Sequence, residues 1–279
     1  MIPAPFDYEV AQSVEHAVEL LGSRDDSKLL AGGHSLIPLL RLRFARPALL
    51  VDIGRVDELR YVRDAGEQLA IGAMTRHHDL QNDPLVQEHT PIVSHTAGLI
   101  GDPQARHRGT IGGSVAHGDP ASDLPTILTA LDADLVVRGP GGERTIPAAE
   151  FFRSVFETAL GPQDVLTEIR VPKLGPAGWS YVKFTRRAQD WATVGVAAVV
   201  RRSNGTIDNA AIALTNMGPT PVRARAAEGA LKSPGDIDPA ADIVAQESDP
   251  PSDTSGSAEY RRHLATVLAR RALEEAISR

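Results

Sequence analysis

Two glycine-rich segments carry the residue types that suit an anionic cofactor. The first spans residues 31–35 (Ala-Gly-Gly-His-Ser) and connects a short apolar run to a helical pattern. A turn of this kind directs free backbone N–H groups at one point, and glycine lets an anion approach the backbone closely. The second spans residues 109–114 (Gly-Thr-Ile-Gly-Gly-Ser) and adds hydroxyl groups that can donate to the same ligand. Together the two segments can hold the diphosphate of a dinucleotide.

Each segment taken alone is also compatible with an ordinary turn. Neither matches G-x-x-x-x-G-K-[ST] or G-x-G-x-x-G, the usual phosphate-binding motifs. The adjacent His77 and His78 point in different directions in a helix or a strand, which is unsuitable for one metal ion. Ser35, Ser114 and Ser122 lack the G-x-S-x-G context of a hydrolase nucleophile. Dinucleotide binding is therefore the chemistry that these patterns favour.

Trp191 is the other residue that could act on a ligand. It lies in Gln-Asp-Trp-Ala-Thr, just before a run typical of a strand. One interpretation is a hydrophobic plug in the core. The other is an aromatic lid over a planar ring, since indole stacks well on flat conjugated systems.

The surrounding patterns predict an α+β protein in three parts. Residues 13–21 have helical spacing with Ser13 as N-cap, and residues 36–43 form a second predicted helix, with Ser35 as a candidate cap. Strands are predicted over 28–31, 48–53, 69–73, 133–137, 165–172, 179–186, 194–202 and 207–215, and a long helix over 258–278. The stretch 106–117 is glycine-rich, and residues 109–114 within it are predicted to be a loop. We expect an α/β lobe over residues 1–56, a second over 57–175, and an antiparallel-sheet domain with helices over 176–279.

Composition narrows the class of protein. The 279 residues carry a net charge of −7 and include no cysteine. The acidic balance disfavours a nucleic-acid partner. Without cysteine the chain cannot ligate an iron–sulfur cluster through thiolates. We find no apolar run of about 18 residues that could span a membrane. We expect a cytoplasmic protein, with a place at the inner face of the cytoplasmic membrane as an open alternative.

The two glycine-rich segments resemble the flavin-binding signatures of a known family. Residues 30–38 (Leu-Ala-Gly-Gly-His-Ser-Leu-Ile-Pro) are similar to the first signature of the FAD subunits of molybdenum hydroxylases. Residues 110–125 resemble the second signature, and residues 3–8, 214–216 and 258–262 also fit. The resemblance covers the whole chain and is strongest to the medium subunits of aerobic carbon monoxide dehydrogenases. It implies two α/β lobes of the PCMH type that bind FAD between them, and a C-terminal domain that covers the flavin.

The resemblance also implies partners and a function. A small subunit would carry two [2Fe–2S] clusters, and a large subunit would carry the molybdenum cofactor, with a dimer of such heterotrimers as the expected assembly. Electrons from carbon monoxide would pass through the clusters to FAD and then to a quinone or another acceptor. Flavin suits this junction because it takes up electrons singly and releases them in pairs. The missing cysteines agree with clusters held in another chain, and they argue against relatives whose flavin subunit carries its own cluster.

Site residues follow from the same resemblance, position by position. The two glycine-rich segments would bind the diphosphate and neighbouring parts of FAD. Asp123 would form a hydrogen bond with a polar group of the cofactor. Lys183 would make a polar contact near the flavin. Ile100 and Leu166 would be apolar contacts. No catalytic residue and no metal ligand is implied. The complete set is Leu30, Ala31, Gly32, Gly33, His34, Ser35, Leu36, Ile37, Ile100, Thr110, Gly112, Gly113, Ser114, His117, Asp123, Leu166, Lys183 and Trp191.

Two positions depart from the family pattern. Ser114 replaces the more usual asparagine, and Trp191 stands where carbon-monoxide-oxidising relatives tend to have tyrosine.

Two alternative functions stay open beside that of a carbon monoxide dehydrogenase subunit. One is the flavin subunit of a hydroxylase for an N-heterocycle, a purine or an aldehyde. The other is a scaffold or ligand-binding protein without a cofactor, which the intact glycine pairs argue against.

Overall fold

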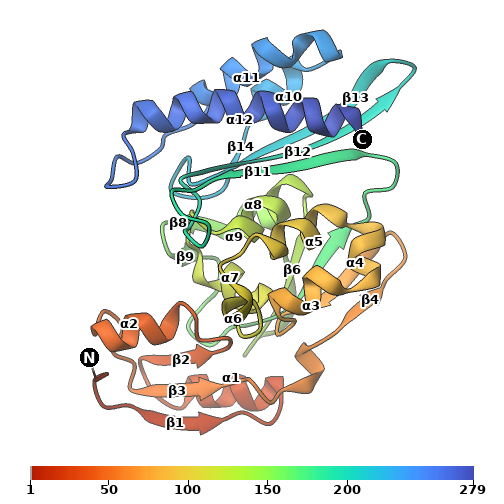
Figure 1. The fold of residues 1–279 in the computed structure, drawn as a ribbon. Coiled ribbons are helices and arrows are strands. Elements are labelled where there is room, and N and C mark those ends of the chain that lie inside the picture. Colours follow the sequence, from red (N-terminus) through yellow and green to blue (C-terminus); the bar gives the residue numbers. More distant parts are fainter. Residues whose placement is uncertain (1) are drawn as a thin grey trace.

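Three larger sheets follow one another along the chain in the computed structural model, which describes residues 2–279 (Figure 1). Met1, the first residue of the lobe expected over 1–56, lies outside the described residues. The sheets lie one above another in Figure 1, and helices fill the layers between and outside them. The α+β class expected from the sequence is confirmed.

The N-terminal sheet is parallel, in the order β1-β3-β2 (Asp7–Val10, Leu49–Asp52 and Ser27–Leu30). Helix α1 (Val14–Gly22) buries an apolar stripe, and the Ser13 side chain accepts a hydrogen bond from the His16 N–H, as predicted. Helix α2 (Leu36–Leu42) follows β2. The sequence analysis missed β1, because its four residues are mostly exposed and show no alternation of apolar and polar side chains.

The second sheet is antiparallel, in the order β4-β5-β10-β6-β7. Its strands are Val62–Asp64, Gln68–Gly72, Val165–Pro172, Asp134–Gly139 and Gly142–Pro147. Around it lie η1 (Asp57–Leu59), α3 (His77–Asn82), α4 (Pro84–His89), α5 (Pro91–Gly98), α6 (Pro103–Arg106), α7 (Ile111–His117), α8 (Asp123–Ala130), α9 (Ala148–Phe151), β8 (Phe152–Ser154) and β9 (Glu157–Thr158). Prolines open α4, α5 and α6, where a missing N–H costs the helix nothing.

The loop predicted over residues 109–114 is wrong from Ile111 onward. Helix α7 begins at Ile111, and the Thr110 side chain caps it by accepting from the Gly113 N–H. Two adjacent glycines have a poor intrinsic helix propensity. Tertiary packing overrides that propensity here, because Ile111 and Val115 are fully buried in the core of the second lobe.

The third sheet is antiparallel, in the order β11-β12-β13-β14 (Gly178–Phe184, Val194–Ser203, Thr206–Thr215 and Val222–Arg223). It is followed by α10 (Arg225–Ala230), η2 (Pro234–Asp236), α11 (Ile237–Gln246) and α12 (Ala258–Ser278). A tight turn joins β12 to β13, and Asn204 and Gly205 take positive φ angles there, as expected.

Strand β12 is buried on both of its faces over residues 194–200. Val196 and Ala198 belong to the core that includes residues of α11 and α12, whereas the alternating Ala197 and Val199 join the core of the second lobe. The C-terminal sheet is therefore sandwiched between α12 above and α8 below (Figure 1). This double burial joins the last two parts of the molecule through apolar contact.

Candidate cofactor-binding site

The first glycine-rich segment, residues 31–35, leaves the end of β2 at Leu30 and enters α2. Gly33 has a φ of 79°, which few other residues adopt readily. The backbone N–H groups of residues 32–36 donate to no acceptor within residues 2–279. Ser35 was predicted to cap α2, but its side chain makes no capping bond. The segment thus presents five successive free donors, which is the arrangement that an anion requires.

Three glycines bring separate segments into backbone contact. A Cβ on Gly32 would lie 2.3 Å from the Arg108 carbonyl oxygen, and one on Gly109 would lie 2.8 Å from His77 Cδ2. A Cβ on Gly112 would lie 2.5 Å from the Ala73 Cβ. The first segment is thereby packed on the second, and the second on the end of β5. At these positions glycine is required by packing within the chain.

The second glycine-rich segment offers hydroxyls, whereas the N–H groups of its glycine pair are already bonded within the chain. The N–H of Gly112 donates to the Ala73 carbonyl at 2.9 Å, and that of Gly113 donates to Thr110 Oγ1 at 3.1 Å. The Thr110 hydroxyl accepts in that bond, so its own proton stays available to a ligand. Ser114, in the same helical turn, is half-buried. His117, at the other end of α7, stacks with Phe156 at 4.9 Å between ring centroids.

A pocket between the two segments is cationic, and the sequence analysis missed its charged residues. Arg60, Arg76 and Arg108 line it. The remaining lining residues are Ala31, Gly32, Gly54, Met74 and Thr110. Within the described part of the chain, neither Arg76 nor Arg108 forms an ion pair, and the buried Arg60 Nε has no partner. A pocket lined by guanidinium groups and by no carboxylate is suited to a diphosphate.

These arginines gave no signal in the sequence. Arg60 follows η1, Arg76 precedes α3, and Arg108 follows α6. They lie 16 and 32 positions apart (76 − 60 and 108 − 76), so that no local motif connects them. Backbone hydrogen bonds from Met74 to Leu59 and from His77 to Gly109, together with the close packing of Gly32 on Arg108, bring their segments together.

A second group of predicted residues forms a buried polar cluster under the C-terminal sheet. Lys183 Nζ donates to Asp123 Oδ2 at 2.8 Å and to the Leu99 carbonyl at 3.4 Å. The Tyr181 hydroxyl donates to Asp123 Oδ1 at 2.6 Å and lies 3.0 Å from Thr215 Oγ1. The side chains of Asp123 and Lys183 are only 4% and 7% exposed. The cluster therefore joins α8 to β11 and β13.

Burial raises the pKa of the Asp123 carboxyl, and the Lys183 cation and the Tyr181 hydroxyl oppose that rise. Burial likewise raises the pKa of Tyr181 far above its usual value, which keeps the phenol protonated. Both carboxylate oxygens of Asp123 are thus occupied by donors of this chain. Lys183 has two acceptors among the described residues and, with three N–H protons, can make a further bond.

The two predicted apolar contacts, Ile100 and Leu166, lie in the core of the second lobe. Ile100 follows the Leu99 carbonyl to which Lys183 donates, and it packs against the core that contains Leu166. Leu166 itself is buried at the bulge where β10 pairs with β6. Ile100 and Leu166 therefore belong to the same core cluster, and Leu166 has little exposed surface.

Trp191 lies on the loop between β11 and β12 and is 54% exposed, so it is not a core plug. The loop is fixed at its far end. Asn216 Nδ2 donates to the Ala192 carbonyl at 2.7 Å, and the fully buried Arg261 donates to the Thr193 carbonyl. Arg261 is held in turn by both carboxylate oxygens of Asp253 at 2.7 Å. The base of the loop is rigid and its tryptophan is free to contact a ligand.

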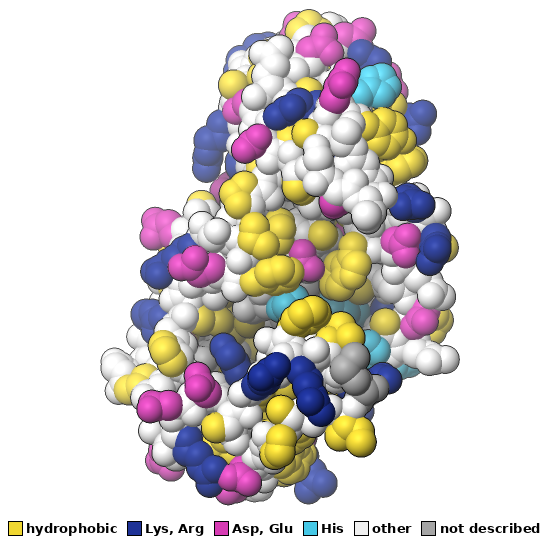
Figure 2. Space-filling view, turned by 90° about the vertical axis from the view of Figure 1, so that its left-hand side faces the viewer, with side chains coloured by type: hydrophobic (Ala, Val, Ile, Leu, Met, Phe, Trp, Pro, Cys, Tyr) yellow, Lys and Arg dark blue, Asp and Glu magenta, His cyan; other side chains and the backbone are white. Residues whose placement is uncertain are grey.

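Figure 2 shows the face on which these elements meet. Apolar and histidine side chains line a hollow at mid-height, between the N-terminal lobe below and the rest of the molecule above.

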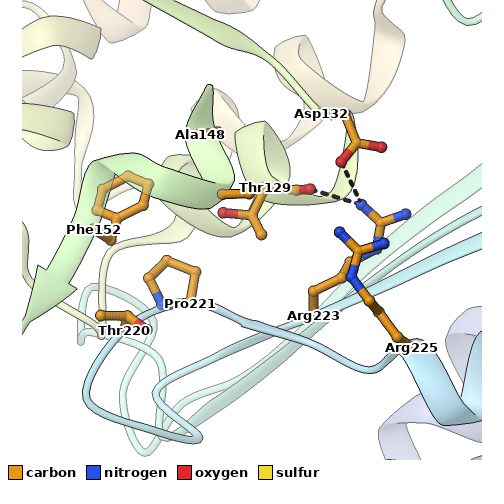
Figure 3. A pocket seen from close by; sticks show the side chains of 9 residues that line it. Thr129, Asp132, Ala148, Phe152, Thr220, Pro221, Arg223 and Arg225 are labelled. Carbon is orange, nitrogen blue, oxygen red and sulfur yellow. Dashed lines mark hydrogen bonds and ion pairs between the residues drawn. The ribbon is translucent and has the colours of Figure 1, made fainter. Parts of the chain in front are cut away.

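A different pocket lies at the C-terminal end of α8, where Arg225 and Phe152 face each other across Thr129 and Pro221 (Figure 3). There Arg223 donates to the Thr129 carbonyl at 2.9 Å and to Asp132 at 3.1 Å. That pocket shares no lining residue with the arginine pocket.

Comparison with known proteins agrees with this geometry. Residues 4–174 match the family model "FAD binding domain in molybdopterin dehydrogenase", and residues 179–276 match "CO dehydrogenase flavoprotein C-terminal domain". The chain belongs to this family of FAD-binding subunits. No helix within residues 2–279 is both long enough and apolar enough to cross a membrane.

Relatives of this flavoprotein family align along their whole length. The carbon monoxide dehydrogenase medium chain of Hydrogenophaga pseudoflava is 44% identical over 285 residues, covering 100% of this chain and 99% of the relative. The 6-hydroxypseudooxynicotine dehydrogenase complex subunit alpha of Paenarthrobacter nicotinovorans is 42% identical over 286 residues, covering 100% and 97%. A solved structure of carbon monoxide dehydrogenase from Hydrogenophaga pseudoflava, lacking the Mo-pyranopterin moiety, superimposes with a TM-score of 0.98 at 46% identity, covering 100% and 99%.

The residues present fit the FAD that this family binds. Residues 32–36 supply free N–H donors, and the arginine pocket supplies positive charge with no carboxylate in its lining. Both features lie where the two glycine-rich segments touch. The donor set therefore matches the diphosphate of a dinucleotide.

Proposed function

We propose that this chain is the FAD-binding electron-transfer subunit of a molybdenum-containing carbon monoxide dehydrogenase. The observation that carries the proposal is the contact between the two glycine-rich segments, which lies beside free N–H groups and a pocket lined by arginines. The full-length similarity to carbon monoxide dehydrogenase medium chains supports the choice of complex. Bound FAD would supply the capacity to take up electrons singly and release them in pairs.

The chain's own residues hold and shield the cofactor in this proposal. The N–H groups of residues 32–36 and the hydroxyls of Thr110 and Ser114 bind and orient the diphosphate. Arg76 and Arg108 balance its charge. Trp191, on a loop with a rigid base, limits the access of water to the ring system. The other residues assigned by resemblance, from Leu30 to Lys183, belong to the same proposed site.

Partners and boundaries complete the proposal. A small subunit with two [2Fe–2S] clusters would deliver electrons, and a large subunit with the molybdenum cofactor would oxidise the substrate. We place the complex in the cytoplasm as a dimer of heterotrimers, with a quinone or another oxidant as acceptor.

The three larger sheets support domain boundaries near 56/57 and 175/176, because they lie within residues 7–52, 62–172 and 178–223.

A second candidate is the flavin subunit of a hydroxylase for an N-heterocycle. The 42% identity to a subunit of the 6-hydroxypseudooxynicotine dehydrogenase complex favours it. The substrate is chosen in another chain, so the two candidates predict the same behaviour for this one. They separate when the purified complex is assayed with carbon monoxide and with heterocycles.

The test uses the chain purified without partners and loaded with FAD. We expect a yellow protein that chemical reductants bleach and that does not oxidise carbon monoxide with an artificial dye as acceptor. Activity should appear only when the iron–sulfur and molybdenum subunits are added. Turnover by the lone chain, or failure to retain FAD, would contradict the proposed function.

A further inference from the structure

The pocket at the C-terminal end of α8, which we call the α8 pocket, lies between the second lobe and the C-terminal domain (Figure 3). Thr129 and Phe152 line it from the lobe, and Pro221, Arg223 and Arg225 line it from the C-terminal domain. Its volume is about 180 Å³, somewhat larger than an engineered protein cavity of about 150 Å³ that accepts benzene. The pocket is therefore large enough for a small organic molecule that contacts both parts of the chain.

Arg223 is a fixed cation in the wall of the α8 pocket. Its side chain is 12% exposed, and its Nε donates to Glu228. Its Nη1 donates to the carbonyls of Thr129 at 2.9 Å and Ala130 at 3.3 Å, and it pairs with Asp132 at 3.1 Å. Its Nη2 has no acceptor within residues 2–279. The guanidinium is thus held in one orientation, with the two protons of Nη2 left for a ligand.

Arg225 supplies a second cation to the α8 pocket. Its side chain forms neither a hydrogen bond nor an ion pair in the described part of the chain. The N–H groups of Ala226 and Ala227, in the first turn of α10, already donate to Glu247, so the group on offer here is the arginine side chain. The two arginines and Asp132 together give the lining one net positive charge. A single anionic group balances that charge.

The end of the α8 pocket away from Arg225 is apolar. Figure 3 shows Phe152 and Pro221 on the opposite side of the pocket from Arg225. Ala148 and Ala149 also line the pocket. A ligand site of this kind, apolar with a few polar groups at one end, selects a molecule with an apolar body and one polar head.

We propose that the α8 pocket binds a small monocarboxylate with a flat apolar body, for which benzoate is the probe. The carboxylate accepts hydrogen bonds from Arg225 and from Arg223 Nη2, and the ring packs against Phe152. The α8 pocket shares no lining residue with the arginine pocket, so the inference goes beyond the proposed function. Because the ligand contacts both the second lobe and the C-terminal domain, its binding stabilises their arrangement.

Two other kinds of ligand fit the α8 pocket less well. A phosphate group carries about two negative charges at pH 7. It would bring its second charge toward Asp132 and leave the space beside Phe152 unfilled. An ammonium compound would meet the unpaired cation of Arg225.

The experiment titrates benzoate into the FAD-loaded chain and measures the heat of binding. We expect a Kd of about 1 mM or below for the parent. Arg225→Gln should weaken binding about 10-fold, because a charge-assisted contact is lost. Arg202→Gln removes another exposed arginine, which lies outside the pocket, and as the matched control it should change the Kd less than about 2-fold.

Ala149→Trp tests the apolar end of the pocket. Ala149 is exposed, so a larger side chain can fill the pocket without disturbing the core, and the melting temperature without benzoate should stay that of the parent. Benzoate should then bind at least about 10-fold more weakly. Benzyl alcohol, which has the ring without the charge, and acetate, which has the charge without the ring, should each bind the parent at least about 10-fold more weakly than benzoate.

Three results would overturn the proposal. Equal benzoate affinity in the parent, Arg225→Gln and Ala149→Trp would show that benzoate binds elsewhere. Tighter binding of acetate or inorganic phosphate than of benzoate would show that the pocket selects charge alone. In the complex with the partner subunits we expect the same Kd, and loss of benzoate binding there would assign Arg225 to a subunit contact.

Discussion

Gly32 shows how one absent side chain joins two parts of the site. A Cβ there would lie 2.3 Å from the Arg108 carbonyl oxygen, a backbone atom that cannot swing away. We expect Gly32→Ala to push the first glycine-rich segment off the second and to raise the Kd for FAD at least tenfold, which corresponds to a loss of about 1.4 kcal/mol of binding free energy. The flavin retained per protein after purification should therefore fall.

The matched control is Gly141→Ala, because a Cβ at Gly141 meets nothing within 4 Å. It should leave the flavin content at the level of the parent. Full flavin content in Gly32→Ala would show that contact between the segments is not needed for binding. Flavin absorbance per protein measures both variants.

His77 couples stability to pH. Its ring is 5% exposed, its Nδ1 has no partner among the described residues, and burial lowers its pKa to about 4. The unfolded chain takes up a proton here below about pH 6.5, whereas the folded chain does not. The stability contributed by the neutral ring is therefore complete above about pH 6.5 and is lost as the pH falls toward 4. The loss amounts to about 3 kcal/mol over that range.

The measurement is urea unfolding of the parent and His77→Gln above and below about pH 6.5. The parent should lose more stability on acidification than the variant, which has nothing to titrate at this position. Parallel pH profiles would show that His77 is not held neutral by the fold.

Helix α8 is held at both ends by the C-terminal domain. Lys183 and Tyr181 bind Asp123 in its first turn, and Arg223 binds the carbonyl of Thr129 in its last turn. Because these polar contacts lie at opposite ends of α8, they fix both the distance of the C-terminal sheet from the helix and the angle between them. The placement of the C-terminal sheet on the second lobe is therefore set by this helix.

We expect Lys183→Met to lower the free energy of unfolding by about 3 kcal/mol, because it leaves the buried Asp123 without its cation. Lys173→Met is the control, since Lys173 pairs with the exposed Asp64 at 2.7 Å and should matter much less. Adding Asp123→Asn to Lys183→Met should recover part of the loss. Urea denaturation checks all three variants, and equal effects at positions 183 and 173 would contradict the role of the buried pair.

The loop between β11 and β12 should control access to the flavin. Trp191 is half-exposed while the loop base is tied to Asn216 and Arg261. We expect Trp191→Ala to keep the stability and FAD content of the parent, and to raise flavin fluorescence and the rate of reoxidation by oxygen, because the ring loses its cover.

The chain's two tryptophans allow a direct control. In Trp179→Phe the remaining tryptophan emission comes from Trp191 alone, and FAD should quench it if the ring lies nearby. Emission that FAD does not change, together with an unaltered reoxidation rate in Trp191→Ala, would show that this side chain is remote from the cofactor.

Long regular elements could be predicted from the sequence, whereas α7 could not. Strand β10 and helix α12 have the predicted bounds of 165–172 and 258–278, because their periodic patterns extend over many residues. Helix α7 contains the Gly112–Gly113 pair, whose weak propensity is outweighed by burial of Ile111 and Val115. Local patterns do not contain such long-range contacts.

Only part of the candidate site could be predicted from the sequence. The two glycine-rich segments are visible as motifs, but the arginines of the pocket are scattered over 49 positions from Arg60 to Arg108. They converge through backbone hydrogen bonds between separate segments, such as that of the His77 N–H to the Gly109 carbonyl, and through the close packing of Gly32 on Arg108. A cationic pocket assembled by three separate turns has no signature in one sequence.

At the scale of the whole molecule, cofactor binding and folding should be linked. The proposed FAD site draws on residues 31–37 of the first lobe and on Arg76 and Arg108 of the second. A ligand that binds only the folded chain raises its stability, by about 2.7 kcal/mol at a concentration about a hundred times its Kd. We expect the melting temperature of the apoprotein to rise on addition of FAD.

Gly32→Ala should show no such rise, and Gly141→Ala should show all of it. An equal rise in the parent and in Gly32→Ala would place the cofactor away from the contact between the two lobes. Differential scanning calorimetry with and without FAD provides the comparison.

The β12–β13 hairpin offers a place for attaching labels. Its tight turn at Asn204 and Gly205 is exposed and lies at the end of the hairpin. At the C-terminal end, by contrast, the Arg279 guanidinium stacks 3.7 Å from the centre of the Trp179 ring, and Arg43 bonds to the carbonyl of Ile2 near the other end. A fluorophore or affinity peptide inserted after Asn204 would leave both of these contacts, α2 and the Trp191 loop undisturbed.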